Sequence, residues 1–283
     1  MWCTLRPNRT KVVPRFLKAH FFVPLCCAMP DAHRAQPEAG PNRRDLLLYS
    51  VLFTLAGGLL PVENGWLGLT AEYWAMVGAR VLCFEVYHYI AGPALAVELD
   101  SLSHSALCTW LSIIYLANGG AIPLPVEHML KTHSYVYFLH DLARNFALYF
   151  NGGFSLMFAV HHVLSICLLG MSLSFGLGWI CSSLVVTEWT NILRAREQIY
   201  LLHNNFSTAS RGSTFRRRLR MTFELSFVFT RLVVTPGYTA MWIWHIAEKM
   251  PPLFLMLLIL LSALINIGGG VWSFLIIRKR VPK

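Results

Sequence analysis

Residues 253–277 read LFLMLLILLSALINIGGGVWSFLII, a stretch without a charged side chain, and the basic residues 278–280 follow directly. A bilayer has a hydrocarbon core about 30 Å thick, and a helix that crosses it needs about 20 mostly apolar residues. The stretch therefore predicts a transmembrane helix. The basic residues at its end are typical of the cytosolic side of a membrane.

The rest of the chain repeats this pattern. Its 283 residues are 55% hydrophobic and 13% charged, about half the charged share of an ordinary soluble domain, which excludes a water-soluble globular protein. Apolar runs alternate with short polar breaks. Membrane-spanning β-strands would show alternating polarity over about ten residues, and the sequence has no such pattern. We expect an all-α, multi-pass transmembrane bundle with spans near 45–61, 72–95, 103–122, 133–151, 156–175, 178–202, 221–246 and 253–277.

Basic residues gather in three places: before Asp45, in 211–220, and at the end of the chain. With eight spans, a cytosolic N-terminus puts all three clusters on the cytosolic side, as the positive-inside rule requires. Residues 1–44 are then a basic cytosolic arm. The net charge of +10 does not indicate nucleic acid as a partner, because no basic fold with interleaved aromatic residues accompanies the clusters.

The seven cysteines show neither a CxxC motif nor the Cys/His spacing of a zinc site. Most fall inside apolar runs, where cysteine behaves as a small hydrophobic residue. We therefore expect no disulfide framework, no metal site and no resident cofactor.

Ionisable residues recur inside the predicted spans, although each costs at least about 2.5 kcal/mol near the centre of a membrane helix. They are Glu85, His88, His140, Asp141, Arg144, His161, His162, Glu188, Arg194, Arg196, Glu197, Glu224 and Arg231, with the polar Asn191. A rise of about 1.5 Å per residue puts most of them in the cytosolic half of the membrane. This shared depth predicts a polar cavity that opens towards the cytosol.

Structural pairing along one helix is the alternative explanation. The candidate pairs are Asp141–Arg144, Arg194–Glu197 and Glu224–Arg231. Neighbouring residues point about 100° apart around a helix, so His161 and His162 cannot both face one cavity in the same way. We expect one of them to face the cavity and the other to bond a neighbouring helix.

Several segments also resemble one family in their order and spacing. Residues 134–142 read SYVYFLHDL, similar to the S-x-Y-F-L-x-D-L helix of TLC-domain proteins, and HHVL at 161–164 resembles the His-His that opens their next helix. EWTNILR at 188–194 and FTRLVVTP at 229–236 are similar to the E-x-S/T…N-L-R and F-x-x-R…P segments. SHSAL at 103–107 resembles the start of the first family helix.

The resemblance implies a core of six helices around a lipid-accepting cavity, in the endoplasmic reticulum or, alternatively, the plasma membrane. The predicted divisions are a basic arm (1–44), two leading helices (45–98), the TLC domain (99–277) and a basic tail (278–283). The family includes ceramide synthases, whose acyl-transfer site uses the His-His and a D-x-x-D on the next helix. Glu188 and Asn191 stand here instead, so the pattern is nearer to non-synthase members tied to phospholipid composition, sphingolipid balance or transport.

Two functions remain open: lipid binding that sets membrane composition or trafficking, and transfer of an acyl chain from acyl-CoA to a lipid. A histidine would take up the acceptor's proton or the acyl group, while a carboxylate orients its ring. The candidate catalytic residues are His161, His162, Asp141 and Glu188, and the candidate substrate-binding residues are Tyr137, Asn191, Arg194 and Arg231. Membrane lipids are the expected partners, with acyl-CoA as co-substrate in the second case.

Overall fold

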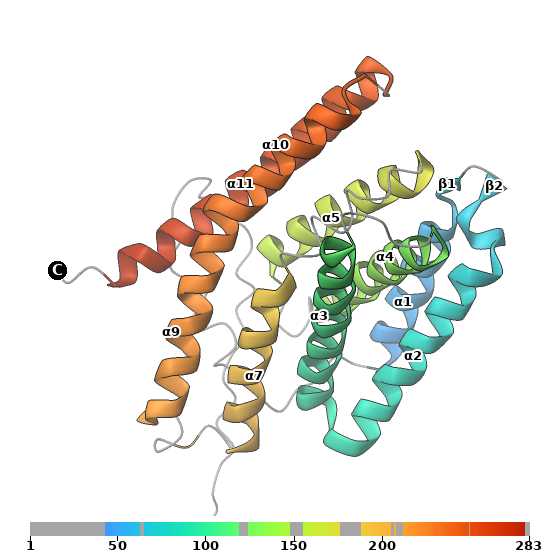
Figure 1. Cartoon of the computed structure of the whole chain (residues 1–283). Coiled ribbons are helices and arrows are strands. Elements are labelled where there is room, and N and C mark those ends of the chain that lie inside the picture. The colour runs from blue at the N-terminus through green and yellow to red at the C-terminus, as the bar shows by residue number, and fades with distance from the viewer. Residues whose placement is uncertain are drawn as a thin grey trace, which may run out of the picture. The chain divides into compact units, whose positions relative to one another are not determined.

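The computed structural model describes residues 43–62, 65–118, 124–147, 155–175, 188–204, 207, 212–248 and 250–280. These regions are almost entirely helical (Figure 1). The helices are α1 (Arg43–Gly58), α2 (Ala71–Ala91), α3 (Pro93–Ala117), α4 (Leu124–Ala147), α5 (Leu156–Ser174), α7 (Trp189–His203), α9 (Thr214–Phe229), α10 (Thr235–Ile246) and α11 (Pro252–Arg280), with a 3-10 turn at Leu67–Leu69 and a π-helical segment at Thr230–Val234. Each expected span overlaps a helix, as the all-α prediction requires. The predicted arm, except for its last two residues, lies outside the described ranges.

A short hairpin connects α1 to α2. In it, β1 (Pro61–Val62) pairs antiparallel with β2 (Gly65–Trp66). The Thr70 hydroxyl then caps α2 by accepting a hydrogen bond from the backbone N–H of Tyr73, at 3.3 Å. The Tyr73 hydroxyl donates to the Thr54 carbonyl at 2.6 Å, so the start of α2 is fixed against α1.

The turn between α2 and α3 differs from the sequence-based expectation. Residues 96–102 were expected to connect two spans, but α3 already begins at Pro93. Gly92 makes this possible, because its φ of +78° reverses the chain in one residue and Pro93 is well suited to the first turn of a helix. Glu98 and Asp100 consequently lie on a helix and point into the protein rather than into a loop.

The start of α4 also comes earlier than expected. Residues 123–132 were predicted as a connection, whereas α4 begins at Leu124. Its first turns are stabilised by an i,i+4 ion pair between Glu127 and Lys131, 2.7 Å apart. Lys131 is buried within α4, so the polar residues at 123–132 did not mark a connection between two helices.

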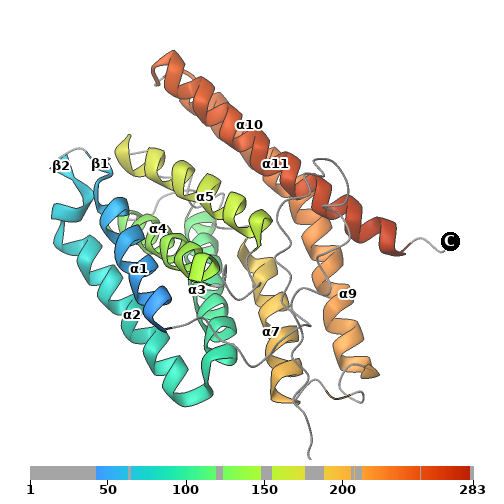
Figure 2. The ribbon, with the colours of Figure 1, turned by 180° about the vertical axis from the view of Figure 1, so that it is seen from behind.

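Two large apolar clusters, and a smaller one between α3 and α4, hold the described helices together. The first lies between α2, α4 and α5 and includes Leu67, Tyr73, Tyr135, Leu139 and Leu169. The second joins α5 to α10 and α11 and includes Leu168, Trp242, Ile246, Leu258 and Leu261. The α1–α4 contact depends on Gly57, because a Cβ atom there would overlap the Leu139 side chain. Helix α3 packs on α7, and α7 packs on α9 (Figures 1 and 2).

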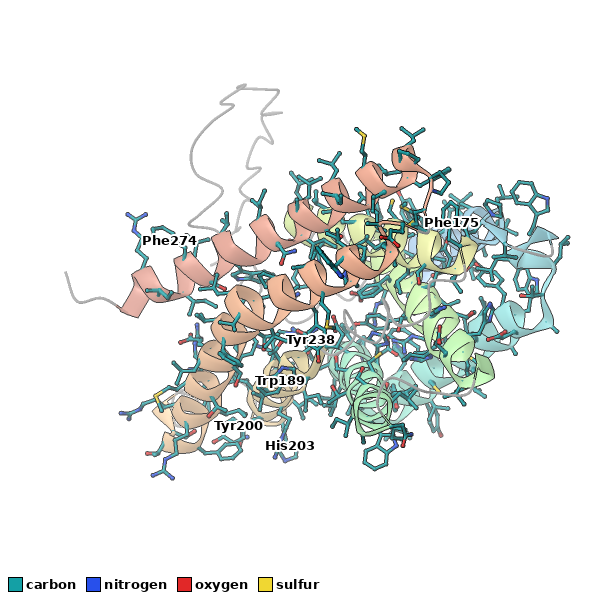
Figure 3. All side chains as sticks on the ribbon, turned by 45° about the horizontal axis from the view of Figure 1, so that its top comes forward. Phe175, Trp189, Tyr200, His203, Tyr238 and Phe274 are labelled. Carbon is teal, nitrogen blue, oxygen red and sulfur yellow. The ribbon has the colours of Figure 1, made fainter. Side chains whose placement is uncertain are left out.

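Helix α11 has the length and composition of a membrane span. Within Pro252–Arg278, its most apolar 18-residue window has a mean hydropathy of 2.3, and among the helices of the described ranges it alone is long and apolar enough to cross a membrane. Phe158–Ser174 is apolar but shorter. Phe274 projects from α11 away from the neighbouring helices (Figure 3) and is 61% exposed, as expected for a side chain in contact with lipid. The count of eight spans stays a prediction.

Candidate functional site

Asp100 lies at the centre of a buried ionic network. It projects from α3, is fully buried, and forms ion pairs with Arg80 of α2 and Arg144 of α4. The Arg144 Nη1 to Asp100 Oδ2 distance is 3.0 Å. Both arginines are 4% exposed. One carboxylate therefore joins three helices through two charge-assisted contacts.

The network continues to α5 through Asp141. Arg144 also donates to Asp141, one helical turn earlier on α4. The other carboxylate oxygen of Asp141 is 3.1 Å from Nε2 of His162. The expected pairing of Asp141 with Arg144 is therefore present, and Asp141 connects that pair to an imidazole at the same time.

Aromatic rings surround the network on the α3–α4 side. The Arg80 guanidinium lies 4.4 Å from the centroid of the Tyr137 ring, a cation–π contact. The His104 ring stacks on Tyr137 at 3.6 Å with a 6° angle between the planes, and the His133 ring lies 5.3 Å from His104. The Tyr137 ring thus packs between the Arg80 guanidinium and the His104 ring.

Helix α7 contributes a second polar group next to the first. Arg194 Nη2 is 3.3 Å from Glu98 Oε2 and 3.2 Å from Ser101 Oγ, both on α3. The alternative that Arg194 pairs with Glu197 is wrong. Because α7 packs between α3 and α9, Arg194 faces α3 while Glu197 faces Arg216 of α9, at 3.0 Å.

At the start of α7, Glu188 accepts a hydrogen bond from the Asn191 side chain at 2.6 Å. The neighbouring Trp189 donates from Nε1 to the Thr230 hydroxyl at 3.1 Å, which ties α7 to the π-helical segment. Arg231 follows Thr230, is buried, and lies within electrostatic reach of Glu188. Its expected partner Glu224 instead contacts Arg220, 2.9 Å away.

Gly269 of α11 makes room for Arg231. A Cβ atom at Gly269 would lie 3.1 Å from Cδ of the arginine, whereas at Gly268 or Gly270 it would meet nothing within 4 Å. The π-helical segment widens the turn that carries Arg231, a distortion that is frequent at functional sites. The arginine is thus held by packing on α11.

The two adjacent histidines have different surroundings, as their helical spacing requires. His162 is buried and contacts Asp141, while His161 is partly exposed and its ring centroid lies 5.4 Å from that of His162. Of the eight candidate residues, the structure brings Asp141, His162 and Tyr137 into one network. It puts Arg194 beside that network and places Glu188, Asn191 and Arg231 around the start of α7. A polar cavity between them stays a prediction.

The sequence analysis missed Arg80 and Asp100 in the network, and Glu98 in the polar group beside it. A lone arginine within an apolar run was the available signal for Arg80. Glu85, which was expected to belong to the charged belt, is exposed on α2, because the buried face of that helix carries Arg80 and Phe84. Among the described residues, no group of three His, Cys, Asp or Glu side chains could hold a metal ion.

Comparison with protein-family models finds the TLC domain at residues 100–278. This segment contains all eight candidate residues and starts at Asp100, whereas Arg80 precedes it. No curated protein and no solved structure matches the chain. The matched segment covers more than half of the 283 residues, and the chain therefore belongs to the TLC-domain family of membrane proteins.

Proposed function

We propose that the protein acts in membrane lipid homeostasis by binding the polar part of a lipid at the network around Asp100. The observation that carries this proposal is a set of buried polar atoms that the network leaves unsatisfied. Among the described residues, Asp100 Oδ1, Arg144 Nε and His162 Nδ1 are buried and have no hydrogen-bond partner. Arg80 Nε, in the same network, also lacks a hydrogen-bond partner within the described ranges. Buried polar atoms are almost always bonded, so several unpartnered atoms in one network suggest a ligand or ordered water.

The depth of the network suits a lipid headgroup. A rise of about 1.5 Å per residue puts Asp100, Arg144 and His162 within about 10 Å of the helix ends that are predicted to be cytosolic. A headgroup has to leave the interface by only a short distance to reach them, while its acyl chains stay among apolar side chains. A headgroup with a hydroxyl or an amide could both donate to Asp100 and accept from Arg144. The endoplasmic reticulum is the proposed location.

Acyl transfer is a second candidate, which one contact favours. His162 Nε2 lies 3.1 Å from Asp141, and its Nδ1 lacks a partner among the described residues, which is the arrangement of an oriented general base. In this reaction Nδ1 takes the proton of a lipid hydroxyl or amine as that group attacks the thioester carbonyl of acyl-CoA. The new ester or amide forms, the carbon–sulfur bond breaks, and the CoA thiolate leaves and takes up the proton.

One experiment on the purified full chain separates the two candidates. The lipids that co-purify with the unaltered chain and with His162→Ala are measured by mass spectrometry, and acyl-CoA consumption is followed in parallel. The matched control is His128→Ala, since His128 also contacts a carboxylate but is half-exposed. Lipid binding predicts that only His162→Ala changes the retained lipids and that no variant consumes acyl-CoA.

Acyl transfer predicts a different pattern. The unaltered chain would then consume acyl-CoA, and His162→Ala would abolish this activity with little loss of bound lipid, because the base acts mainly in the transition state. If His162→Ala retains the same lipids as the unaltered chain and no variant shows turnover, both functions are excluded for this network.

A further inference from the structure

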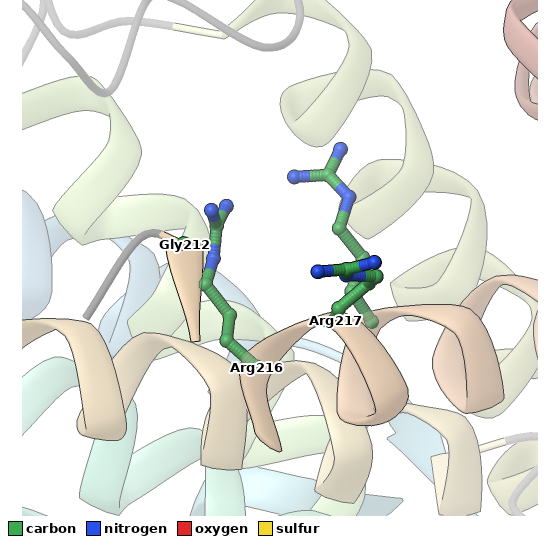
Figure 4. Close-up of a pocket in the computed structure, with 4 residues that line it drawn as sticks. Gly212, Arg216 and Arg217 are labelled. Carbon is green, nitrogen blue, oxygen red and sulfur yellow. The ribbon is translucent and has the colours of Figure 1, made fainter. Parts of the chain in front are cut away.

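The first turns of α9 form a basic hollow that is separate from the network around Asp100. The hollow has a volume of about 230 Å³ and is lined by Gly212, Arg216, Arg217 and Arg220 (Figure 4). Among the described residues, the lining side chains apart from the glycine are all arginines. A guanidinium presents several donors in a planar fork that matches the oxygens of a phosphate group.

Two carboxylates hold part of this cluster in place. Glu197 of α7 lies 3.0 Å from Arg216 and 3.8 Å from Arg220, and Glu224 lies 2.9 Å from Arg220. Arg217 and the neighbouring Arg218 are exposed. The four arginines at 216–218 and 220 exceed these two carboxylates by two positive charges. The hollow is therefore ordered by ion pairs and keeps an excess of positive charge.

The hollow is open on the side of Gly212. A Cβ atom at Gly212 would meet nothing within 4 Å, and its φ does not fall in the left-handed region. Arg216 and Arg217 extend to the same side of α9 (Figure 4). Among the described residues, nothing crowds the hollow on this side.

The position of the hollow along α9 corresponds to a membrane interface. Large apolar side chains are exposed on the same helix at Met221, Leu225 and Phe229. Arg217 precedes Leu225 by eight residues, or about 12 Å along the helix axis. A helix with basic residues at one end and exposed apolar residues beyond them is suited to the boundary between headgroups and acyl chains.

We propose that this hollow binds the phosphate of an anionic phospholipid from the surrounding bilayer. Pockets for drug-sized ligands measure about 300–1,000 Å³, so the hollow is small for a nucleotide such as that of CoA. It suits a single phosphate group whose glycerol and acyl chains remain in the membrane beside Met221 and Leu225. A lipid site of this kind needs no catalytic activity.

The test uses the full chain in nanodiscs of phosphatidylcholine that contain one-tenth phosphatidic acid. Native mass spectrometry measures how much phosphatidic acid the protein retains relative to phosphatidylcholine. The decisive pair is Arg217→Gln and Arg218→Gln: both remove one exposed charge from the same turn, but only Arg217 lines the hollow. We expect Arg217→Gln to lower the retention about fivefold, and Arg218→Gln to lower it less than about twofold.

A second pair of variants leaves all arginines unchanged. Gly212→Glu adds a carboxylate at the open side of the hollow, and Gly212→Gln adds a neutral side chain of similar size. The first should reduce phosphatidic acid retention by at least as much as Arg217→Gln, and the second should have a smaller effect. If Arg217→Gln does not fold, the two Gly212 variants alone test whether the hollow binds phosphatidic acid.

Three outcomes would overturn the proposal. Equal losses for Arg217→Gln and Arg218→Gln, or no loss for Gly212→Glu, would show general attraction to anionic membranes without a site. Displacement of phosphatidic acid by an excess of sodium phosphate would indicate a site for the free ion instead of the lipid. Because none of these variants touches Asp100 or His162, their failure would leave the proposed function of the network unaffected.

Discussion

Replacing Asp100 by asparagine should destabilise the protein more than any other removal of one carboxylate in the described helices. The carboxylate is fully buried and pairs with both Arg80 and Arg144. Removing one partner of a buried ion pair typically costs about 3–5 kcal/mol, because the remaining charge is left unpaired. Arg144 keeps its contact with Asp141, whereas among the described residues Arg80 keeps only its contact with the Tyr137 ring. We therefore expect a loss of about 3 kcal/mol.

Thermal unfolding of the purified protein in detergent, followed by tryptophan fluorescence, measures this loss. For a domain of 150–250 residues, each kcal/mol lowers Tm by about 2–4 °C, so Asp100→Asn should lower Tm by about 6–12 °C. Glu85→Gln is the matched control, since Glu85 is an exposed carboxylate on α2 near Arg80. Its effect should stay within about 0.5 kcal/mol.

A paired replacement tests the reason for the loss. If the cost comes from an unpaired buried arginine, Asp100→Leu combined with Arg80→Met should be more stable than Asp100→Leu alone. The reasoning is refuted if Asp100→Asn unfolds at the same temperature as Glu85→Gln. It is also refuted if the double variant loses the sum of the two single losses, because the pair would then make no coupled contribution.

Three further predictions follow from other contacts. Gly269→Ala should lower stability by about 1–3 kcal/mol in the same unfolding assay, because its methyl group would crowd Arg231, whereas Gly268→Ala should not; equal effects would contradict this packing. His128→Ala should cost no more than about 1 kcal/mol, since its pair with Glu72 is half-exposed, and a larger loss would mean that this pair is shielded from solvent. Tags at the two ends of the chain should both be cleaved by protease in sealed microsomes, and protection of one of them would exclude the predicted even number of spans.

The sequence predicted helices well because the apolar runs report burial in lipid or protein directly. It also located Asp141 and His162 at similar depth, and these two side chains do meet. The pair Asp141–Arg144 was also predictable from the sequence, since both residues lie on one face of one helix. The period of a single helix therefore identified one of the three candidate pairs, whereas Arg194 pairs with Glu98 and Glu224 with Arg220.

Other contacts between helices were not predictable from the spacing within one helix. The partner of Arg194 is Glu98, which became available only because α3 begins at Pro93 and packs against α7. Local spacing favoured Glu197 instead, and it could not show that Glu197 faces α9. The position of Asp100 depended on the same early helix start, which follows from the one-residue turn at Gly92.

The network also bears on how the leading helices relate to the TLC domain. The family match starts at Asp100, so Arg80 is supplied by a helix outside the matched segment. Within the network, the negative charges of Asp100 and Asp141 balance the positive charges of Arg80 and Arg144. Without α2, only Arg144 would remain to pair with the two aspartates. One buried negative charge would then be unpaired, which costs free energy. Helix α2 is therefore needed to neutralise the site, and the matched segment is not electrostatically complete without it.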